Sequence, residues 1–153
     1  MTTAGEILFA DTNVFLSATD RSRKHHAEAR ELLQAAGEGK AILAVSGQII
    51  REYLVVATRP VEVNGLGLAV EDALKNIDVF TRPPFLFCEE SERVSRRLRE
   101  FVQTHRLTGK RVHDGNIVAT MLVEGIDRLI TENAGDFASF KEIEAIGLEA
   151  ASP

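Results

Sequence analysis

Four acidic side chains, Asp11, Glu52, Asp114 and Asp136, have the types and the positions to do chemistry together. Carboxylates that share one cleft repel one another and raise each other's pKa values unless a cation neutralises them. Oxygen ligands without a Cys or His cluster select Mg²⁺ or Mn²⁺ rather than zinc. Such an ion suits phosphoryl chemistry, because it activates a water molecule and stabilises the leaving oxygen. The prediction requires a fold that brings the four acids to one place.

Asp11 directly follows the apolar run 7–10, and Thr12 and Asn13 come next. A short apolar run bounded by polar residues is typical of a strand buried on both faces. In parallel sheets, chemistry occurs at the carboxyl ends of the strands, where Asp11 would lie. The plain structural alternative is that Asp11 caps the helix expected to follow, since Asp is a good N-cap residue.

Glu52 lies inside an expected helix, and its neighbours one turn away are apolar: Ile49, Val55 and Val56. A carboxylate on an apolar stripe is costly unless something pairs with it. Two interpretations remain open for this residue. It is either a functional acid or a salt-bridged one, with Arg51 or Arg59 as the partner.

Asp114 opens another expected helix, where the helix dipole favours an acid for purely structural reasons. It nevertheless shares its helix face with the apolar residues Ile117, Val118 and Met121. Gly115 beside it costs about 1 kcal/mol relative to Ala in a helix. That cost indicates a local reason, such as the close approach of another chain or a ligand.

The segment 131–137 places a hydroxyl, an amide and an acid after an expected strand, in Thr131, Asn133 and Asp136. The alternative is a plain turn, since Asn, Gly and Asp all form turns.

Strands and helices alternate along the chain. Short apolar runs predict strands at 7–10, 41–45, 85–87 and 128–131, with a possible fifth at 143–148. Apolar residues at helical spacing predict helices at 23–36, 68–80, 90–107 and 112–123, and a further helix capped by Ser46 that ends at Arg59-Pro60. This alternation predicts an α/β fold, a three-layer α/β/α sandwich with a central parallel sheet.

The length of 153 residues fits a single domain over 1–153, and the apolar and charged fractions of 44% and 27% are ordinary for a globular protein. No apolar run reaches the ~18 residues of a membrane helix, and we expect no secretory signal. Cys88 is the only cysteine, so an internal disulfide and a thiolate metal cluster are excluded. A cytoplasmic location agrees with this cysteine content.

The net charge of −5 argues against binding of nucleic acid over the whole protein surface, but the basic residues are clustered. Residues 21–30 hold four Lys or Arg against one acid, and residues 93–111 hold seven against one. Clustered cations on an acidic protein can bind phosphates. The alternative for each segment alone is a solvated helix face.

Four stretches resemble, in order, the sequence motifs of PIN domains, and the resemblance covers the chain from Ile7 to about Ile146. They are 9–14 (FADTNV), 46–53 (SGQIIREY), 112–119 (VHDGNIVA) and 129–137 (LITENAGDF). In its length and in having no other domain, the chain resembles the VapC-type toxins of bacterial toxin–antitoxin pairs. Gly115 departs from the family, where a small helix former such as Ala is usual.

The resemblance implies a Mg²⁺- or Mn²⁺-dependent endoribonuclease that cuts a structured RNA, often a tRNA or ribosomal RNA. It also implies a small antitoxin partner and commonly a homodimer. Asp11 and Asp114 would be the main metal ligands, and Glu52 a ligand or an acid that positions metal-bound water. Asn133 or Asp136 would fill the fourth acidic position, with Asp136 preferred for its charge. Asn13, Thr131 and Asn133 would be supporting polar residues, and His113 would be structural.

The expected reaction is in-line attack of metal-activated water on an RNA phosphodiester, which leaves a 5′-phosphate and a 3′-hydroxyl. The side chains expected to bind the RNA backbone are Arg23, Lys24, Arg96, Arg97 and Arg99, and salt should weaken that binding.

The sequence disagrees with two other classes of protein that place an acid after the first strand. A phosphohydrolase of the HAD type needs a second Asp where this chain has Asn13, and a receiver domain needs paired acids near its first strand. A catalytically inactive PIN-like module that binds RNA or protein stays open as the alternative.

Overall fold

The computed structural model describes residues 5–151, which form a five-stranded parallel sheet with the order β3-β2-β1-β4-β5. The strands are β1 (Ile7–Ala10), β2 (Ile42–Ser46), β3 (Leu86–Cys88), β4 (Arg128–Ile130) and β5 (Glu144–Ile146). The apolar runs of the three central strands, β2, β1 and β4, are buried because both faces of the sheet are covered there, whereas Leu86 and Phe87 of the edge strand β3 stay exposed. The predicted parallel sheet is therefore confirmed, including its fifth strand.

The first strand occupies the centre of the sheet. Phe9 of β1 lies in register with Ala44 of β2 on one side and with Leu129 of β4 on the other. Leu8, Phe9 and Ala10 are fully buried. The carboxyl end of β1 therefore opens at the middle of the sheet edge, between the ends of β2 and β4.

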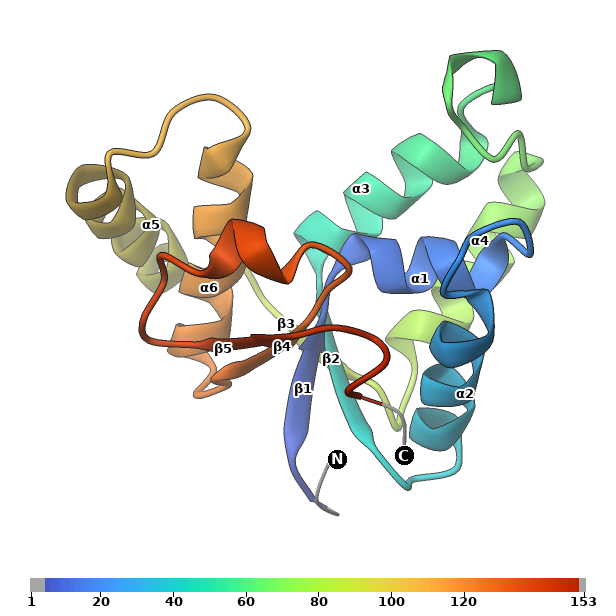
Figure 1. The fold of residues 1–153 in the computed structure, drawn as a ribbon, viewed down its shortest axis with the longest axis horizontal. Helices are drawn as coiled ribbons and strands as arrows, with labels where there is room; N and C mark the ends of the chain where they lie inside the picture. The colour runs from blue at the N-terminus through green and yellow to red at the C-terminus, as the bar shows by residue number, and fades with distance from the viewer. Residues whose placement is uncertain (1–4, 152–153) are drawn as a thin grey trace.

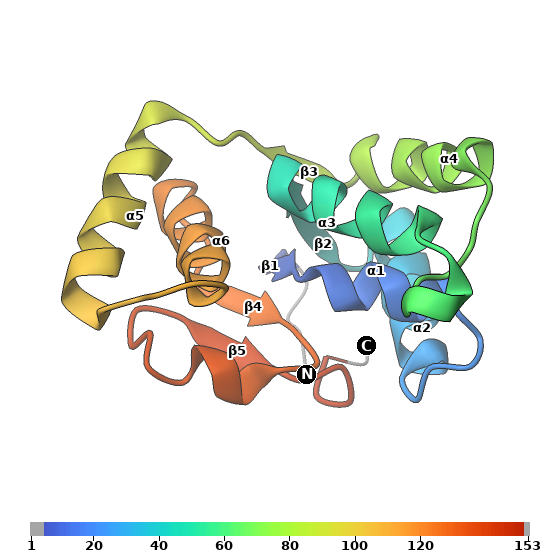
Figure 2. The same ribbon diagram turned by 90° about the horizontal axis from the view of Figure 1, so that it is seen from above.

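Helices cover both faces of the sheet. They are α1 (Thr12–Thr19), α2 (His26–Gly37), α3 (Gly47–Thr58), α4 (Val70–Thr81), α5 (Glu92–His105) and α6 (Arg111–Val123), with short 3₁₀ helices η1 (Val61–Val63) and η2 (Ala134–Phe137). The helices α1 to α4 gather on one side of the sheet, and α5 and α6 gather on the other (Figures 1 and 2). This is the predicted α/β/α sandwich.

Each face of the sheet has its own aromatic group. On the side of α1 to α4, the ring of Phe80 lies 4.6 Å from that of Phe15 and 5.5 Å from that of Tyr53, between ring centroids. On the side of α5 and α6, the rings of Phe101 and Phe140 lie 5.7 Å apart. Aromatic pairs at these separations add to the free energy of burial. The first group joins α1, α3 and α4 to one another, and the second joins α5 to the segment after η2.

The start of α2 differs from the expected one because a side chain before it hydrogen-bonds to the backbone. The backbone N–H and the hydroxyl of Ser22 donate to Asp20 Oδ1 at 2.9 and 2.7 Å, which forms a turn. Helix α2 therefore begins at His26 rather than at residue 23. Ser46 precedes α3 as predicted, but within residues 5–151 its buried hydroxyl makes no capping hydrogen bond and has no other partner.

Gly115 is explained by packing within this chain. A Cβ added there would lie 2.5 Å from Cδ1 of Leu107 and 3.3 Å from Cδ1 of Leu98. The local reason expected for this glycine is therefore the close approach of two leucines of its own chain.

None of the helices formed by residues 5–151 is both long enough and apolar enough to cross a membrane.

Candidate active site

Asp11 lies where β1 ends and α1 begins, and it is only 8% exposed. Its carboxylate accepts a hydrogen bond from the backbone N–H of Thr12 at 2.7 Å, so Asp11 does cap α1. It also accepts from the hydroxyl of Thr131 at 2.7 Å. Thr131 directly follows β4, so this second bond joins the carboxyl ends of two neighbouring strands.

Glu52 points toward the same edge from α3. Its Oε2 accepts from the Thr12 hydroxyl at 2.6 Å, and its Oε1 accepts from the amide of Gln48 at 2.9 Å. The salt-bridge alternative is wrong, because both candidate arginines are engaged elsewhere. Arg51 pairs with Glu90 at 3.3 Å, and Arg59 donates to the carbonyl oxygen of Asn64.

Asp114 lies in the first turn of α6 and is half-buried. Its Oδ2 accepts from Nη1 of Arg111 at 2.7 Å. The same guanidinium donates to the backbone carbonyl of Asp136 and lies 5.7 Å from the ring centroid of Phe140. Arg111 therefore fastens η2 to the start of α6 and neutralises part of the charge of Asp114.

The pKa values of two acids report that the carboxylates affect one another. The pKa of Asp11 is raised from 3.8 to about 6. Burial is the largest cause, the hydrogen bonds from Thr131 and Thr12 oppose the rise, and the charges of Glu52 and Asp114 add to it. Burial likewise raises the pKa of Asp114, Arg111 opposes that rise, and Asp136 and Glu52 add to it. The four predicted acids therefore share one electrostatic neighbourhood.

The supporting polar residues surround Asp11. The amide of Asn13 donates to the hydroxyl of Thr131 at 3.3 Å, and its oxygen accepts from the backbone N–H of Glu132 at 3.1 Å. The backbone N–H of Asn133 donates to the same hydroxyl at 3.1 Å. Asn133 thus orders the loop through its backbone, whereas Asp136 acts on Asp114 by charge. This geometry favours Asp136 for the fourth acidic position.

The donor types fit a hard divalent ion, although the carboxylates do not form a closed set of ligands. Within residues 5–151, no three Asp, Glu, His or Cys side chains are grouped closely enough to hold one ion among themselves. Mg²⁺ does not need such a group, because it keeps several waters and is usually bound by one or two carboxylates. Buried Asp11, which has no arginine partner among the described residues, is the strongest observation in favour of a cation here.

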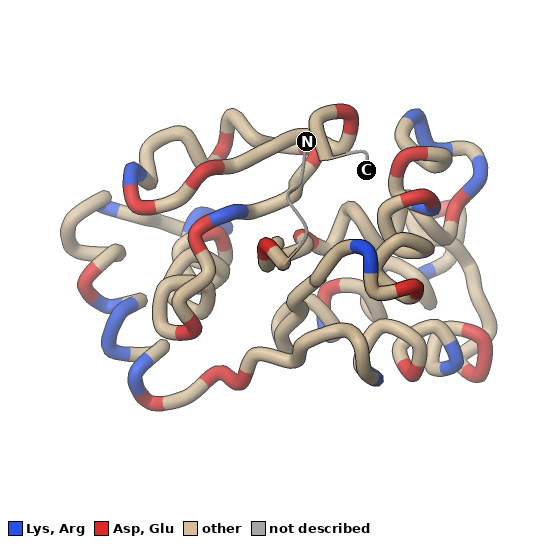
Figure 3. The backbone as a smooth tube through the Cα atoms, turned by 90° about the horizontal axis from the view of Figure 1, so that it is seen from below, with Lys and Arg blue, Asp and Glu red and all other residues tan. Residues whose placement is uncertain are grey.

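The basic residues expected to bind RNA lie at opposite ends of the molecule. Figure 3 shows the basic positions of α5 at one end and those of segment 21–30 at the other. Arg23 lies 3.9 Å from Glu132, beside the acidic site. Arg96 and Arg97 pair with acids of their own helix, Glu92 and Glu100. The structure gives Lys24 and Arg99 no ion-pair partner within residues 5–151, so their charges stay available.

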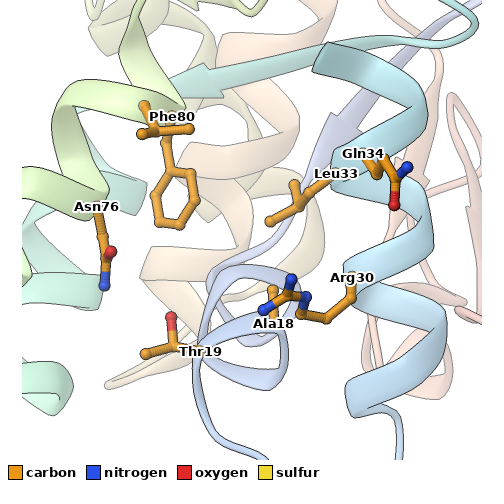
Figure 4. A pocket seen from close by; sticks show the side chains of 8 residues that line it. Ala18, Thr19, Arg30, Leu33, Gln34, Asn76 and Phe80 are labelled. Atoms are coloured by element: carbon orange, nitrogen blue, oxygen red, sulfur yellow. The ribbon is translucent and has the colours of Figure 1, made fainter. Parts of the chain in front are cut away.

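A groove of about 550 Å³ lies away from the acids, between α1, α2 and α4 (Figure 4). Leu33 and Phe80 form its apolar wall, and Arg30 contributes its one cation. The hydroxyl of Thr19 in the wall is already bonded to the carbonyl oxygen of Phe15 and to Tyr53. The groove has no carboxylate in its lining, so it is separate from the site that the four acids form.

Sequence reasoning missed three residues that hold the acids, namely Thr12, Gln48 and Arg111. A local signal existed for two of them. Gln48 precedes Glu52 by four residues and Arg111 precedes Asp114 by three, and both spacings put side chains on one helix face. The contact of Thr12 with Glu52 joins two helices and had no local signal.

A family model described as PIN domain matches residues 8–143. No curated protein matches the chain in sequence.

Several solved bacterial structures share the fold. A toxin–antitoxin complex from Klebsiella pneumoniae is 20% identical, with a TM-score of 0.61 over 92% of this chain and 97% of that chain. VapC20 of Mycobacterium tuberculosis, described as a toxin that cleaves the sarcin-ricin loop, is 15% identical, with a TM-score of 0.67 over 90% and 98%. A DNA-bound VapBC complex from Salmonella typhimurium is 14% identical, with a TM-score of 0.64 over 94% and 98%. At identities this low, the structural similarity establishes a shared fold and nothing more.

Proposed function

The chain belongs to the PIN domain family, and from that membership and the four-acid site we propose that it is a divalent-metal-dependent endoribonuclease, the toxin of a toxin–antitoxin pair. The observation that carries the proposal is the buried carboxylate of Asp11. Burial and two neighbouring carboxylates raise its pKa to about 6, which is an environment that favours a bound cation. Titratable groups perturbed in this way cluster at functional sites.

In the proposed site, Asp11 and Asp114 hold Mg²⁺ or Mn²⁺, with Glu52 and Asp136 beside them. When bound, such an ion supplies an activated water and neutralises charge on the scissile phosphate. The chain's own polar groups fix the carboxylates. Thr131 donates to Asp11 and orients it, and Thr12 does the same for Glu52. Arg111 holds Asp114 until an ion competes for the carboxylate.

The proposed substrate is a structured RNA of the tRNA or ribosomal RNA class. Arg23 beside the acidic edge, and the unpaired cations of Lys24 and Arg99, support contact with a phosphate backbone. The description of one structural neighbour as a toxin that cleaves the sarcin-ricin loop supports the same class. Such an enzyme would act in the cytoplasm.

The proposed protein partners are a small antitoxin and a second copy of this chain. Two of the neighbours named above are toxin–antitoxin complexes, which supports the first partner. Large apolar side chains stay exposed on one side of the molecule, on α3, η1 and α4, which supports burial against another protein. They are Val55, Val61, Val63, Val70, Leu74 and Val79.

A nuclease assay on total cellular RNA tests the proposal. The unaltered chain should cleave RNA with Mg²⁺ and stop when EDTA is added, and Asp11→Asn should be inactive. Asp78→Asn, at an exposed position on α4, is the matched control and should keep full activity. Mapping the RNA ends should give a 5′-phosphate and a 3′-hydroxyl. Cleavage that is indifferent to EDTA and to Asp11→Asn would refute the proposal, and RNA binding without any cleavage would favour the inactive binding module.

A further inference from the structure

Gln48 is a buried amide at the junction of three polar groups. It lies in the first turn of α3, and it is 3% exposed. Its Nε2 donates to Oε1 of Glu52 at 2.9 Å and to the backbone carbonyl of His113 at 2.9 Å. Its oxygen accepts from Nδ2 of Asn116 at 2.8 Å. Every polar atom of this side chain therefore has a partner.

The chemistry of the partners fixes how this amide is turned. A carboxylate oxygen and a backbone carbonyl only accept hydrogen bonds, so the nitrogen of Gln48 must face them. Asn116 in turn donates to Oε1 of Glu90 at 2.6 Å, and a carboxylate again only accepts. Both amides thus have one satisfied orientation, and a flip of either would set oxygen against oxygen.

This junction joins the carboxylate of Glu52 to the backbone of α6 at the residue before Asp114. Glu52 belongs to α3, and Asp114 follows His113 in α6, across the sheet (Figure 1). We propose that Gln48 is a positioning residue, which fixes the separation of Glu52 and Asp114 and so prepares both carboxylates for one divalent ion. The inference rests on the proposed function.

A purely structural amide would look the same in burial but would behave differently in solution. Loss of a structural amide lowers the melting temperature and leaves the affinity for an ion unchanged. Loss of a positioning amide changes the affinity itself, because each carboxylate must then be ordered when the ion binds. In other metal sites, removing a group that orients a metal ligand typically lowers the metal affinity by roughly 10- to 100-fold.

The test is calorimetric titration of the full chain with Mn²⁺, which reads binding without activity. Gln48→Met keeps the length of the side chain and removes both donors and the acceptor. We expect the dissociation constant for Mn²⁺ to rise by about tenfold. Asn116→Ala leaves Gln48 in place but removes the donor that orients it, so a smaller rise is expected. The double variant should show less than the sum of the two effects, because both changes act through one junction.

The matched control is Gln34→Met in α2. Gln34 donates to Glu38 at 3.0 Å with the same four-residue spacing, but that pair is exposed and far from the site. Circular dichroism and thermal unfolding check that each variant folds. If Gln48→Met fails to fold, Asn116→Ala decides alone.

Two failures can be told apart. If the unaltered chain binds Mn²⁺ no better than Asp11→Asn does, the proposed function fails and this inference fails with it. If the unaltered chain binds Mn²⁺ and both Gln48→Met and Asn116→Ala bind it equally well, the proposed function stands and the positioning role is overturned.

Discussion

The folded structure disfavours the ionised form of the Asp11 side chain. Its pKa lies above the ordinary value of 3.8, at about 6, with burial as the largest cause. The folded chain therefore binds this proton more tightly than the unfolded chain does. The contribution to stability is fully present below about pH 4 and is lost as the pH rises through about 6. At neutral pH without a cation, ionised Asp11 destabilises the fold.

The first prediction is that Asp11→Asn stabilises the protein in EDTA at pH 7.5. The pKa difference corresponds to at most about 3 kcal/mol, and we expect the free energy of unfolding to rise by about 1–3 kcal/mol. Urea denaturation measures this change. Repeating the measurement at pH 4 should remove most of the difference. The control is again Asp78→Asn, and a lower stability of Asp11→Asn at pH 7.5 would contradict the account.

The second prediction concerns Arg111, which occupies Oδ2 of Asp114. Because its guanidinium competes with any bound cation, Arg111→Met should tighten Mn²⁺ binding by about threefold, the equivalent of a weak ion pair. Calorimetric titration measures the change, whose direction is opposite to that expected for Gln48→Met. Arg97→Met is the control, since Arg97 also pairs with an acid three residues away and lies over an aromatic ring. Weaker binding by Arg111→Met would show that Arg111 orders the site instead.

At the scale of elements, α6 packs so closely against its own chain that any side chain at position 115 would displace its neighbours. Gly115 is buried in α6, and the tips of Leu107 and Leu98 occupy the space where a side chain would lie. Glycine costs helix stability there, but it lets the loop after α5 close over the helix that carries Asp114. The packing of α5 and α6 thus fixes the end of the helix from which Asp114 projects.

The third prediction follows from this contact. Gly115→Ala should change the free energy of unfolding by less than about 1 kcal/mol, because the gain in helix propensity offsets the shift of the Leu107 tip. Gly115→Val should lower it by about 2 kcal/mol, since a branched side chain must also move Leu98. Thermal and urea unfolding measure both. Gly37→Val in α2, where nothing lies within 4 Å, is the control and should cost little. Equal stability of Gly115→Val and the unaltered chain would refute the packing account.

At the scale of the whole molecule, the acids follow the carboxyl ends of the central strands, and the two basic ends, α5 and segment 21–30, lie on opposite sides of the sheet (Figures 1 and 2). If the proposed RNA substrate contacts both ends, cations would neutralise its phosphates on either side of the acids. Lys24 and Arg99 serve as probes of the two ends, because neither has an ion-pair partner within the described part of the chain.

The fourth prediction is that Lys24→Ala and Arg99→Ala each weaken RNA binding and each reduce the slope of log affinity against log salt by about 1. Binding is measured in an Asp11→Asn background, so that the RNA stays intact. The effects should add in the double variant, since the two ends are far apart. Lys75→Ala, on exposed α4, should leave the slope unchanged. A slope that responds at one end alone would mean that the RNA contacts only that end.

The sequence by itself determined the order of the elements, the parallel sheet and the four acids at its edge. These follow from local causes: apolar runs form strands buried on both faces, and polar residues stand where those strands end. It could not determine where each helix begins, because Asp20 and Ser22 make a turn that competes with α2.

Only the tertiary structure decided which group holds each carboxylate. Glu52 had two arginines available along the chain, yet its partners are Thr12 and Gln48. Asp114 looked like a free ligand but is held by Arg111. Such partners depend on how helices from the two layers meet across the sheet, and a difference of a few ångströms in that packing makes or breaks each hydrogen bond. Spacing along the chain fixes which residues are candidates, whereas the distance between layers selects among them.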